Sequence, residues 1–503
     1  MKVPPQTRHT LNNDIKRTAK DSFIYLPSRV IPAITGILLI RVLTTLFTPE
    51  EYGFYQITLS TFGLIRVFSM VWVSSSVTRF FLSYKNKSKQ NIFYSTLFIC
   101  SVIGAVVVVI VSFFINRFYF FSKIDAELYH LINIAIAASF FTALFETFIV
   151  VFRAGLEAKK YSLFWILFSV GKPLLGIALI LLFGFRVDGI FWAFLVIPFI
   201  LEIIIFTQIG LFQSLAGKNF SHDLAKQFLR YGLPITMSFL AFWILSLSDR
   251  YLIEYFQSTS QVGFYSVGYV ISEKTLNFLY MILMLAAYPI IVDSWEKHGK
   301  DYTQHLISEL TRIFFIICIP FLVILVTLPD HVLLVFASDK FIKGANVLPL
   351  IAIGVFFNGL NQYVLKSFEL QKKSYKIAGL AFFAGSTNII ANIILIPRLG
   401  YVGAGVSACL AYIVYFLSGW FFARKELAFR PPLYSITKIV LAGTIAGFFM
   451  SIVADWIQKT LFVIILVIPA GLLLFIGALF LLKELKKQDM IEGWNYLLRF
   501  VRK

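Results

Sequence analysis

Charged side chains stand inside long apolar segments of this 503-residue chain. In the stretch LSLSDRYLIEYF, residues 245–256, Arg250 interrupts an otherwise apolar run. A charge at the centre of a membrane-spanning helix costs about 3 kcal/mol, so it normally faces a protein interior or a water-filled cavity. Because guanidinium and ammonium groups bind phosphate oxygens, the deep cations are candidate contacts for an anionic ligand. These cations are Arg29, Arg41, Arg66, Lys172, Arg250 and Lys274.

Acidic side chains in the same segments offer a second kind of chemistry. A carboxyl group that gains and loses a proton within a span can carry a coupling ion, either a proton or sodium. The candidates for ion coupling are Glu146, Asp249, Glu254 and Glu273.

An alternative interpretation is that these charges pair with one another and hold helices together. Arg250 and Glu254 are four residues apart on one helical face and can neutralise each other. Asp249 points about 100° away from Arg250 and is available to Arg41 or Lys274. Both interpretations stay open for each residue, and the surplus of cations favours an anionic ligand.

Motifs for catalysis and for metal binding are missing from the sequence. The three cysteines lie singly in apolar runs, and the six histidines form no HExxH or similar spacing. Neither a GxxxxGK[ST] phosphate loop nor a GxSxG elbow occurs. We therefore expect neither an enzyme nor a bound metal or cofactor.

The composition is that of a polytopic membrane protein. Hydrophobic residues make up 59% of the chain and charged residues 14%, and the mean hydropathy is +0.82. The apolar runs predict an all-α protein with about fourteen transmembrane helices. They lie near residues 22–46, 53–82, 92–116, 128–152, 161–184, 189–211, 232–256, 264–293, 307–329, 345–369, 375–396, 403–423, 434–456 and 461–482.

The distribution of basic residues predicts the orientation. If the N-terminus is cytoplasmic, roughly four times as many lysines and arginines fall in the inner segments as in the outer loops. This bias accounts for the net charge of +19 without a nucleic-acid partner. We expect a multi-pass protein of the cytoplasmic (inner) membrane, with both termini cytoplasmic and no cleaved signal peptide.

Short similarities indicate an internal repeat. Gly53-Phe54-Tyr55 recurs as Gly263-Phe264-Tyr265, and Lys159-Lys160 recurs as Lys372-Lys373. Both displacements correspond to six helices, an even number, so the two halves enter the membrane in the same direction. We predict an N-terminal lobe at 1–215, a C-terminal lobe at 216–430, and two further helices with a basic cytoplasmic tail at 431–503. The deep charges are expected to line a cleft between the lobes, which rock to give alternating access.

Three stretches resemble a known family. TPEEYGFYQI (48–57), YGLPITMSFLAFWILSLSDRYLI (231–253) and YVGAGVSACLAY (401–412) are similar to the polysaccharide biosynthesis proteins, or Wzx-type O-antigen flippases, of the multidrug/oligosaccharidyl-lipid/polysaccharide exporter superfamily. The resemblance implies a flippase that moves a polyprenyl-pyrophosphate-linked oligosaccharide across the membrane for O-antigen or exopolysaccharide synthesis. Its implied partners are that lipid-linked oligosaccharide, membrane lipids, and as candidates a polysaccharide polymerase and other assembly proteins.

Candidate sugar contacts are aromatic and amide side chains, although ordinary packing is the alternative for each. The residues are Trp243, Tyr269, Asn277, Asn358, Asn361 and Gln362. Arg250 is the first candidate for the phosphate contact, so Arg250→Ala is expected to stop polysaccharide export.

Three other functions remain open. A lipid II flippase also has fourteen spans, but the Asn-Pro-Arg triplet expected of it is missing. A multidrug antiporter of the same superfamily usually has twelve spans and acidic cation sites. A non-transporting scaffold of a polysaccharide assembly complex would need no lined cleft.

Overall fold

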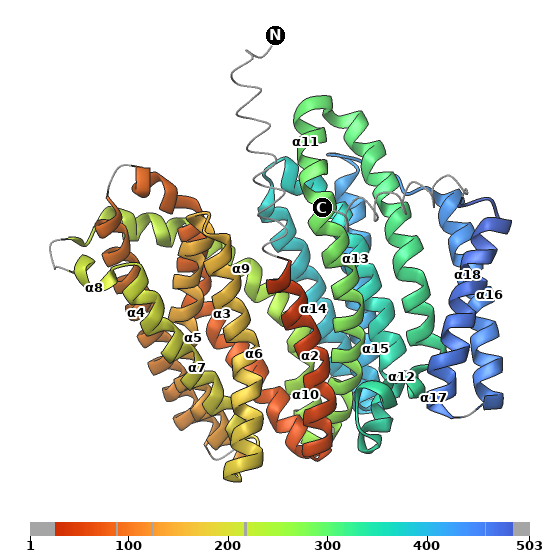
Figure 1. The fold of residues 1–503 in the computed structure, drawn as a ribbon, viewed down its shortest axis with the longest axis horizontal. Coiled ribbons are helices and arrows are strands. Elements are labelled where there is room, and N and C mark those ends of the chain that lie inside the picture. The colour runs from red at the N-terminus through yellow and green to blue at the C-terminus, as the bar shows by residue number, and fades with distance from the viewer. Residues whose placement is uncertain (1–25, 87–88, 122–123, 216–218, 458, 486–503) are drawn as a thin grey trace. The chain divides into compact units, whose positions relative to one another are not determined.

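The computed structural model describes residues 26–86, 89–121, 124–215, 219–457 and 459–485, and these ranges contain helices and no strand (Figure 1). The helices up to residue 256 are α2 (Pro27–Leu46), α3 (Pro49–Asn86), α4 (Gln90–Ile115), the π-helix η1 (Asn116–Phe120), α5 (Ala126–Ala154), α6 (Ala158–Phe183), α7 (Asp188–Gln208), α8 (Leu211–Ser214), α9 (His222–Leu247) and α10 (Asp249–Phe256).

The rest of the described chain is also helical. It contains α11 (Thr259–Thr327), α12 (Pro329–Phe336), the 3₁₀-helix η3 (Asp339–Asn346), α13 (Leu348–Leu370), α14 (Ser374–Leu399), α15 (Tyr401–Ala423), α16 (Leu433–Ile457), α17 (Thr460–Phe462), the π-helix η4 (Val463–Val467) and α18 (Ile468–Leu481).

Helix lengths confirm the predicted polytopic membrane fold. Within the described ranges, 13 helices are long and apolar enough to cross a membrane. The longest, α11, has 69 residues and contains Gly299 with φ 77° and ψ −163°, which no α-helix accommodates. Dividing α11 there gives segments 259–298 and 300–327, each longer than the roughly 20 residues that a span needs. The prediction of about fourteen spans is therefore confirmed.

One predicted span is interrupted. The apolar run at 232–256 was expected to form a single helix, but α9 ends at Leu247 and α10 begins at Asp249, although Ser248 between them keeps helical backbone angles (φ −67°, ψ −25°). The interruption at Ser248 lies inside LSLSDRYLIEYF, immediately before the charged pair Asp249 and Arg250. Because the run at 232–256 is mostly apolar, hydropathy alone does not predict two helices here.

The chain divides into two compact units. Unit 1 comprises Met1–Leu39 and Glu50–Arg250, and unit 2 comprises Ile40–Pro49 and Tyr251–Lys503. In unit 1, α7 packs on α5 and α6, and in unit 2, α15 packs on α13 and α14 in the same pattern. The predicted domain boundaries after residues 215 and 430 stay a prediction.

Backbone conformation repeats between the two halves in detail. Leu156 (φ 62°) and Lys372 (φ 60°) adopt the left-handed conformation that non-glycine residues rarely adopt, and they are 216 positions apart. Gly184 (φ 74°) and Gly400 (φ 63°), which end α6 and α14, are also 216 positions apart. The six-helix repeat inferred from short similarities therefore extends to the turns that end its helices.

Hydrogen bonds in these turns match as well. The amide of Glu157 donates to the Phe152 carbonyl at 2.8 Å, and the amide of Lys373 donates to the Phe368 carbonyl at 2.8 Å. Each bond runs from an amide to the carbonyl five residues earlier, which is the pattern that typically ends a helix at a left-handed residue. The two turns are thus equivalent, with Lys372 and Lys373 at the positions of Leu156 and Glu157, whereas Lys159 and Lys160 lie in the first turn of α6.

Helix α9 belongs to the packing of unit 1. Gly232 meets the backbone of Trp72 on α3 so closely that a Cβ atom has no room. The Ser76 hydroxyl donates to the Phe228 carbonyl at 3.2 Å, and the Trp243 indole donates to the Ser60 carbonyl at 3.0 Å. Trp243, a candidate sugar contact, is therefore engaged in holding α9 to α3.

Helices α16 and α18 lie side by side in unit 2 (Figure 1). Gly443 and Gly447 form a small-xxx-small pair that faces Val323 on α11, and Gly471 of α18 faces Met450 of α16. In membranes, where no hydrophobic force drives helices together, such close approach supplies the packing.

Candidate functional site

An ion pair lies within the transmembrane helices of unit 1. Arg66 on α3 donates from Nε to Oε2 of Glu146 on α5 at 3.1 Å, and from Nη2 to Oε1 at 2.5 Å. The Glu146 side chain is 5% exposed and that of Arg66 is 33% exposed. The carboxylate is therefore buried, while part of the guanidinium remains accessible.

Lys172 on α6 joins this pair. Its Nζ lies 3.6 Å from the centre of the Phe168 ring and 4.4 Å from that of Phe194, and it interacts electrostatically with Glu146 and Arg66. Among the described residues, no hydrogen bond or ion pair at Nζ accompanies these ring contacts. Aromatic faces attract an ammonium group, but they leave its three N–H donors to another acceptor.

The sequence positions these groups locally. Lys172 precedes Pro173 inside α6, and Phe168 is one turn before Lys172 on the same face. Two basic groups and one carboxyl group give the cluster a formal net charge of +1. We call Arg66, Glu146 and Lys172 the unit 1 charge cluster, and its chemistry suits an anion.

Arg41 has a different environment. In unit 2 its Nη1 donates to the Leu334 carbonyl at 3.0 Å and also to the Ala337 carbonyl, at the C-terminal end of α12. A cation in this place satisfies carbonyls that lack helical partners and meets the negative end of the helix dipole. Arg29, also on α2, is exposed. Arg41 thus has a structural role that the sequence did not indicate.

The three charges of LSLSDRYLIEYF are mostly buried. Asp249 is 0% and Arg250 is 2% exposed. Arg250 donates from Nη1 to the Ser246 carbonyl at 3.2 Å. Glu254 accepts a hydrogen bond from the Thr259 hydroxyl at 2.9 Å. In this conformation Arg250 is much less accessible than Arg66, although its role as a phosphate contact stays a prediction.

Unit 2 contains a polar network on α11 and α13. Glu273 accepts a hydrogen bond from Asn277, and Lys274 lies 3.8 Å from Glu273 with its side chain 44% exposed. Tyr280 hydrogen-bonds with Asn358 and interacts with Glu273. Thus Glu273, Lys274 and the candidate sugar contacts Asn277 and Asn358 come together.

Two further tyrosines extend the polar character of unit 2. The hydroxyls of Tyr269 on α11 and Tyr412 on α15 are 3.0 Å apart, and Tyr412 interacts with Glu273. Asn361 on α13 is 0% exposed, and neither of its amide atoms has a hydrogen-bond partner among the described residues. Gln362 is half-buried. Apart from Trp243, the predicted sugar contacts therefore lie on the helices of one unit.

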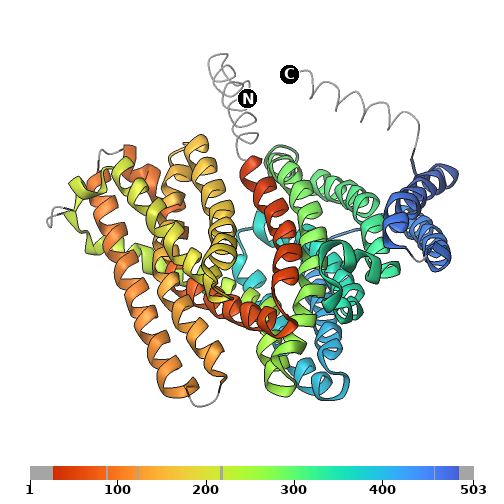
Figure 2. The same cartoon turned by 60° about the horizontal axis from the view of Figure 1, so that its bottom comes forward.

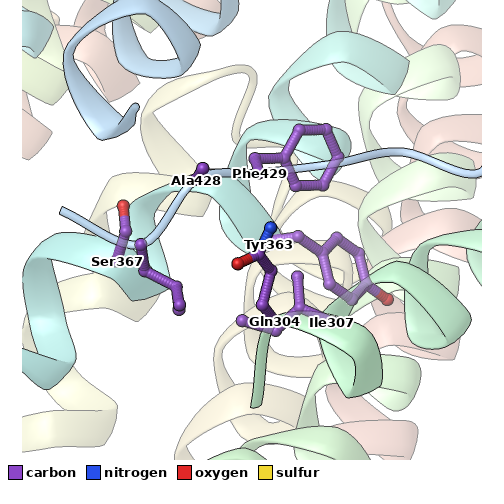
Figure 3. A pocket seen from close by; sticks show the side chains of 7 residues that line it. Gln304, Ile307, Tyr363, Ser367, Ala428 and Phe429 are labelled. Atoms are coloured by element: carbon purple, nitrogen blue, oxygen red, sulfur yellow. The ribbon is translucent and has the colours of Figure 1, made fainter. Parts of the chain in front are cut away.

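A small cavity lies within unit 2, between α11, α13 and the segment after α15 (Figure 3). Its volume is about 10 Å³, which is room for one water molecule and not for a sugar. It is lined by Gln304, Ile307, Tyr363, Ser367, Leu427, Ala428 and Phe429. The predicted substrate cleft between the lobes stays a prediction.

Two acidic residues had no assigned role in the sequence interpretation. Glu202 lies buried on α7, and Glu484, which is 4% exposed, accepts a hydrogen bond from Nε of Arg312 at 2.5 Å. Glu202 carries a visible signal, since it follows Pro198 by four residues in an apolar run. The pairing of Glu484 with Arg312 of α11 depends on packing between residues far apart in the sequence, so no sequence signal indicated it.

A family comparison identifies the relatives of this chain. The model of the family described as "Polysaccharide biosynthesis protein" matches residues 18–295, more than half of the sequence. The chain belongs to the polysaccharide biosynthesis protein family. The resemblance inferred from three short stretches is thus confirmed.

Individual relatives of this polysaccharide biosynthesis protein are distant but extensive. It is 23% identical to a Shigella flexneri protein named as an O-antigen transporter, over 80% of this chain and 97% of the relative. A structure titled "Lipid II flippase MurJ, inward closed conformation" matches with a TM-score of 0.73 at 16% identity, covering 94% of this chain and all of that one.

A transporter of the multidrug resistance MATE family, in an inward-facing conformation, matches with a TM-score of 0.64 at 15% identity. The match covers 80% of this chain and 97% of that one. At this level of identity, both solved structures show a shared transporter fold, and the residues within it must decide the substrate.

Proposed function

We propose that this polysaccharide biosynthesis protein is a flippase for a polyprenyl-pyrophosphate-linked oligosaccharide, working by alternating access across the cytoplasmic membrane. Membership of the family and the similarity to an O-antigen transporter support this substrate class. The protein's own contribution is to bind the pyrophosphate and sugars away from lipid while the polyprenyl tail stays in the bilayer.

The unit 1 charge cluster is the observation that carries the proposal. A pyrophosphate that leaves water must gain hydrogen-bond donors from the protein in place of its hydration. Cations within a membrane span are costly, so they normally serve a function such as binding an anion. Lys172 offers N–H donors toward an acceptor that the surrounding rings do not supply. Arg66 offers the accessible part of a guanidinium that Glu146 already holds in position.

The polar network of unit 2 suits the sugar part of the substrate. Tyrosine hydroxyls and asparagine amides both donate and accept, as sugar hydroxyls require. Tyr269, Asn277 and Asn358 lie on neighbouring helices with Glu273 and Lys274. In the proposal, this network is a sugar-binding surface of unit 2 in its own right.

Location and partners follow from the same substrate. We place both termini on the cytoplasmic side, where the substrate would be loaded, because basic residues concentrate there. The product would pass on the outer side to a polymerase or another assembly protein. No chemical step on the substrate is required.

The proposal is tested in a strain that lacks its own flippase and displays a surface polysaccharide when complemented. Lys172→Gln is expected to abolish surface polysaccharide while membrane protein level is maintained. Lys226→Gln is the matched control, since Lys226 is an exposed lysine of the same unit. Full display by Lys172→Gln would remove the observation on which the proposal rests.

A second candidate function is lipid II flipping. It is favoured by the fold match over 94% of this chain. Expression in cells depleted of their lipid II flippase distinguishes the two. Growth rescue would favour lipid II, whereas restored surface polysaccharide without growth rescue would favour the oligosaccharide substrate.

A further inference from the structure

Glu202 is a buried carboxyl group of unit 1. It lies on α7 about two turns before the helix ends, and it is 4% exposed. Its Oε2 atom is buried and has no hydrogen-bond partner among the described residues, and no ion pair involves it there. This contrasts with Glu146 on α5, which is equally buried but is held by Arg66.

The charged form of an isolated carboxyl in such surroundings is strongly disfavoured. An ionised carboxylate that loses its water without a partner neutralises instead. The protonated acid carries no net charge and leaves only a hydroxyl and a carbonyl oxygen to be accommodated. The surroundings of Glu202 therefore select the carboxylic acid.

Charges on the neighbouring helices do not change this conclusion. α7 packs on α5, α6 and α8, and ring contacts from Phe62 and Phe98 also place α3 and α4 against it. Within the membrane portion of these helices the charged residues are Glu146, which pairs with Arg66, and Lys172, which faces two phenylalanine rings. Tyr94 and Cys100 of α4 carry no formal charge. The remaining titratable groups lie near helix ends, and they are Glu50, Glu51, Tyr52, Tyr55, Arg79, Tyr84, Lys85, Glu127, Tyr129, His130, Arg153, Lys159, Lys160, Tyr161 and Asp188.

The surroundings of Glu202 also contain a break in helical bonding. Pro198, one turn earlier on α7, cannot donate to the Phe194 carbonyl. The hydroxyl of Thr142 on α5 donates to that carbonyl instead, at 3.2 Å. At this turn a side chain replaces a missing backbone hydrogen bond. Bending the helix here therefore costs less free energy than bending a regular helix.

Aromatic rings pack around α7 on the C-terminal side of Glu202. Phe206, one turn after Glu202, packs on Phe148 with ring centres 4.8 Å apart and on Phe98 at 5.7 Å. Glu202 thus lies between a proline-weakened turn and an aromatic layer. A change in either one would admit water to the carboxyl group, and hydration favours release of its proton.

We propose that Glu202 is a proton-binding site that couples transport to the proton gradient. In this conformation the side chain is the neutral acid. In a conformation where water reaches it, the acid gives its proton to water and becomes a carboxylate, and it takes a proton back before the rings close. This inference rests on the proposed function, because it gives the same transport cycle its driving ion.

The first arm of the test needs only the purified full-length protein. Infrared spectra at neutral pH are expected to contain a carboxylic acid C=O band that shifts in D₂O and is missing in Glu202→Gln. Glu127→Gln is the matched control, since it makes the same change at an exposed site. A wild-type spectrum without such a band, or an unchanged band in Glu202→Gln, overturns the proposal.

The second arm measures flipping of a labelled lipid-linked oligosaccharide in proteoliposomes, with and without an imposed pH difference. The wild type is expected to flip faster with the gradient in one direction. Glu202→Gln, which resembles the neutral acid, is expected to flip at equal rates with and without it, and Glu202→Asp to regain part of the difference. A gradient effect that survives in Glu202→Gln overturns the proposal.

The two arms separate this inference from the proposed function. If the wild type does not flip the oligosaccharide at all, the proposed function fails, while the infrared band still decides whether Glu202 holds a proton. If the wild type flips the oligosaccharide at the same rate with and without the gradient, the function stands and proton coupling through Glu202 is refuted.

Discussion

The pair of Arg66 and Glu146 allows a structural role to be separated from ligand binding. In Arg66→Gln, the Glu146 carboxylate, which is 5% exposed in the wild type, loses its guanidinium partner. Removing one partner of a buried pair costs about 3 to 5 kcal/mol. Because Arg66 itself is 33% exposed, solvent screening reduces the expected loss to about 2 to 3 kcal/mol. In the double variant Arg66→Gln/Glu146→Gln no charge is stranded, and stability should return to within about 1 kcal/mol of the wild type.

Ligand affinity is expected to follow a different order. A hydrogen bond to a charged group contributes about 1.5 to 3 kcal/mol, so loss of Arg66 should weaken pyrophosphate binding by roughly ten- to a hundredfold in both the single and the double variant. Glu146→Gln removes the competing carboxylate and raises the cluster's net charge. It should therefore bind pyrophosphate more tightly than the wild type.

The assay combines denaturation of the detergent-solubilised variants with titration of a short-chain prenyl pyrophosphate followed by calorimetry. A double variant that regains stability but not affinity supports anion binding by Arg66. A double variant that regains both would show that Arg66 serves only to neutralise Glu146, and the reasoning about the unit 1 charge cluster would be wrong.

Two further predictions concern unit 2. Hydrogen bonds from Lys373 and Lys376 lower the pKa of Glu426 from 4.5 to about 2. Its carboxylate therefore stabilises the folded protein above pH 4.5, and this contribution shrinks as pH falls from 4.5 toward 2, so the melting temperatures of wild type and Glu426→Gln should converge over that range. At Gly447 a Cβ would lie 2.8 Å from a valine of α11, so Gly447→Leu should lower the free energy of unfolding by about 1 to 3 kcal/mol. The control is Gly477→Ala, where a Cβ meets nothing within 4 Å, and it should have little effect in the same thermal assay.

The helical plan of the molecule was largely predictable because it depends on local composition. The run at 128–152 became α5 (Ala126–Ala154), and the repeat inferred from short similarities reappears in the turns at Leu156 and Lys372. The α11 hairpin bends at Gly299, within the polar break between two predicted spans. Hydropathy and glycine positions suffice for such features.

The partners of the charged residues were not predictable, because they depend on contacts distant in sequence. Arg41 binds the end of α12, which lies 293 to 296 residues away. Glu146 proved to be the partner of Arg66, 80 residues away. Arg250 looked like the first phosphate contact from composition, yet only the packed structure shows it to be 2% exposed.

Figure 2 shows α4 and α5 of unit 1 as an antiparallel pair, and Glu146 lies on α5. Their arrangement in unit 1, together with α3 and α6, brings Arg66 into contact with the Glu146 carboxylate and places Lys172 within its electrostatic influence. The position of each cation therefore depends on a different helix, which is why no single sequence motif contains the cluster.

The central claim is that this protein moves a pyrophosphate-linked oligosaccharide by means of the unit 1 charge cluster. The most direct measurement is flipping of a labelled polyprenyl-pyrophosphate oligosaccharide by purified protein in liposomes, comparing wild type with Arg66→Gln/Lys172→Gln. We predict transfer across the bilayer by the wild type and background transfer by the double variant, with both proteins folded and inserted. Equal transfer by the two proteins, or none by the wild type, would contradict the account.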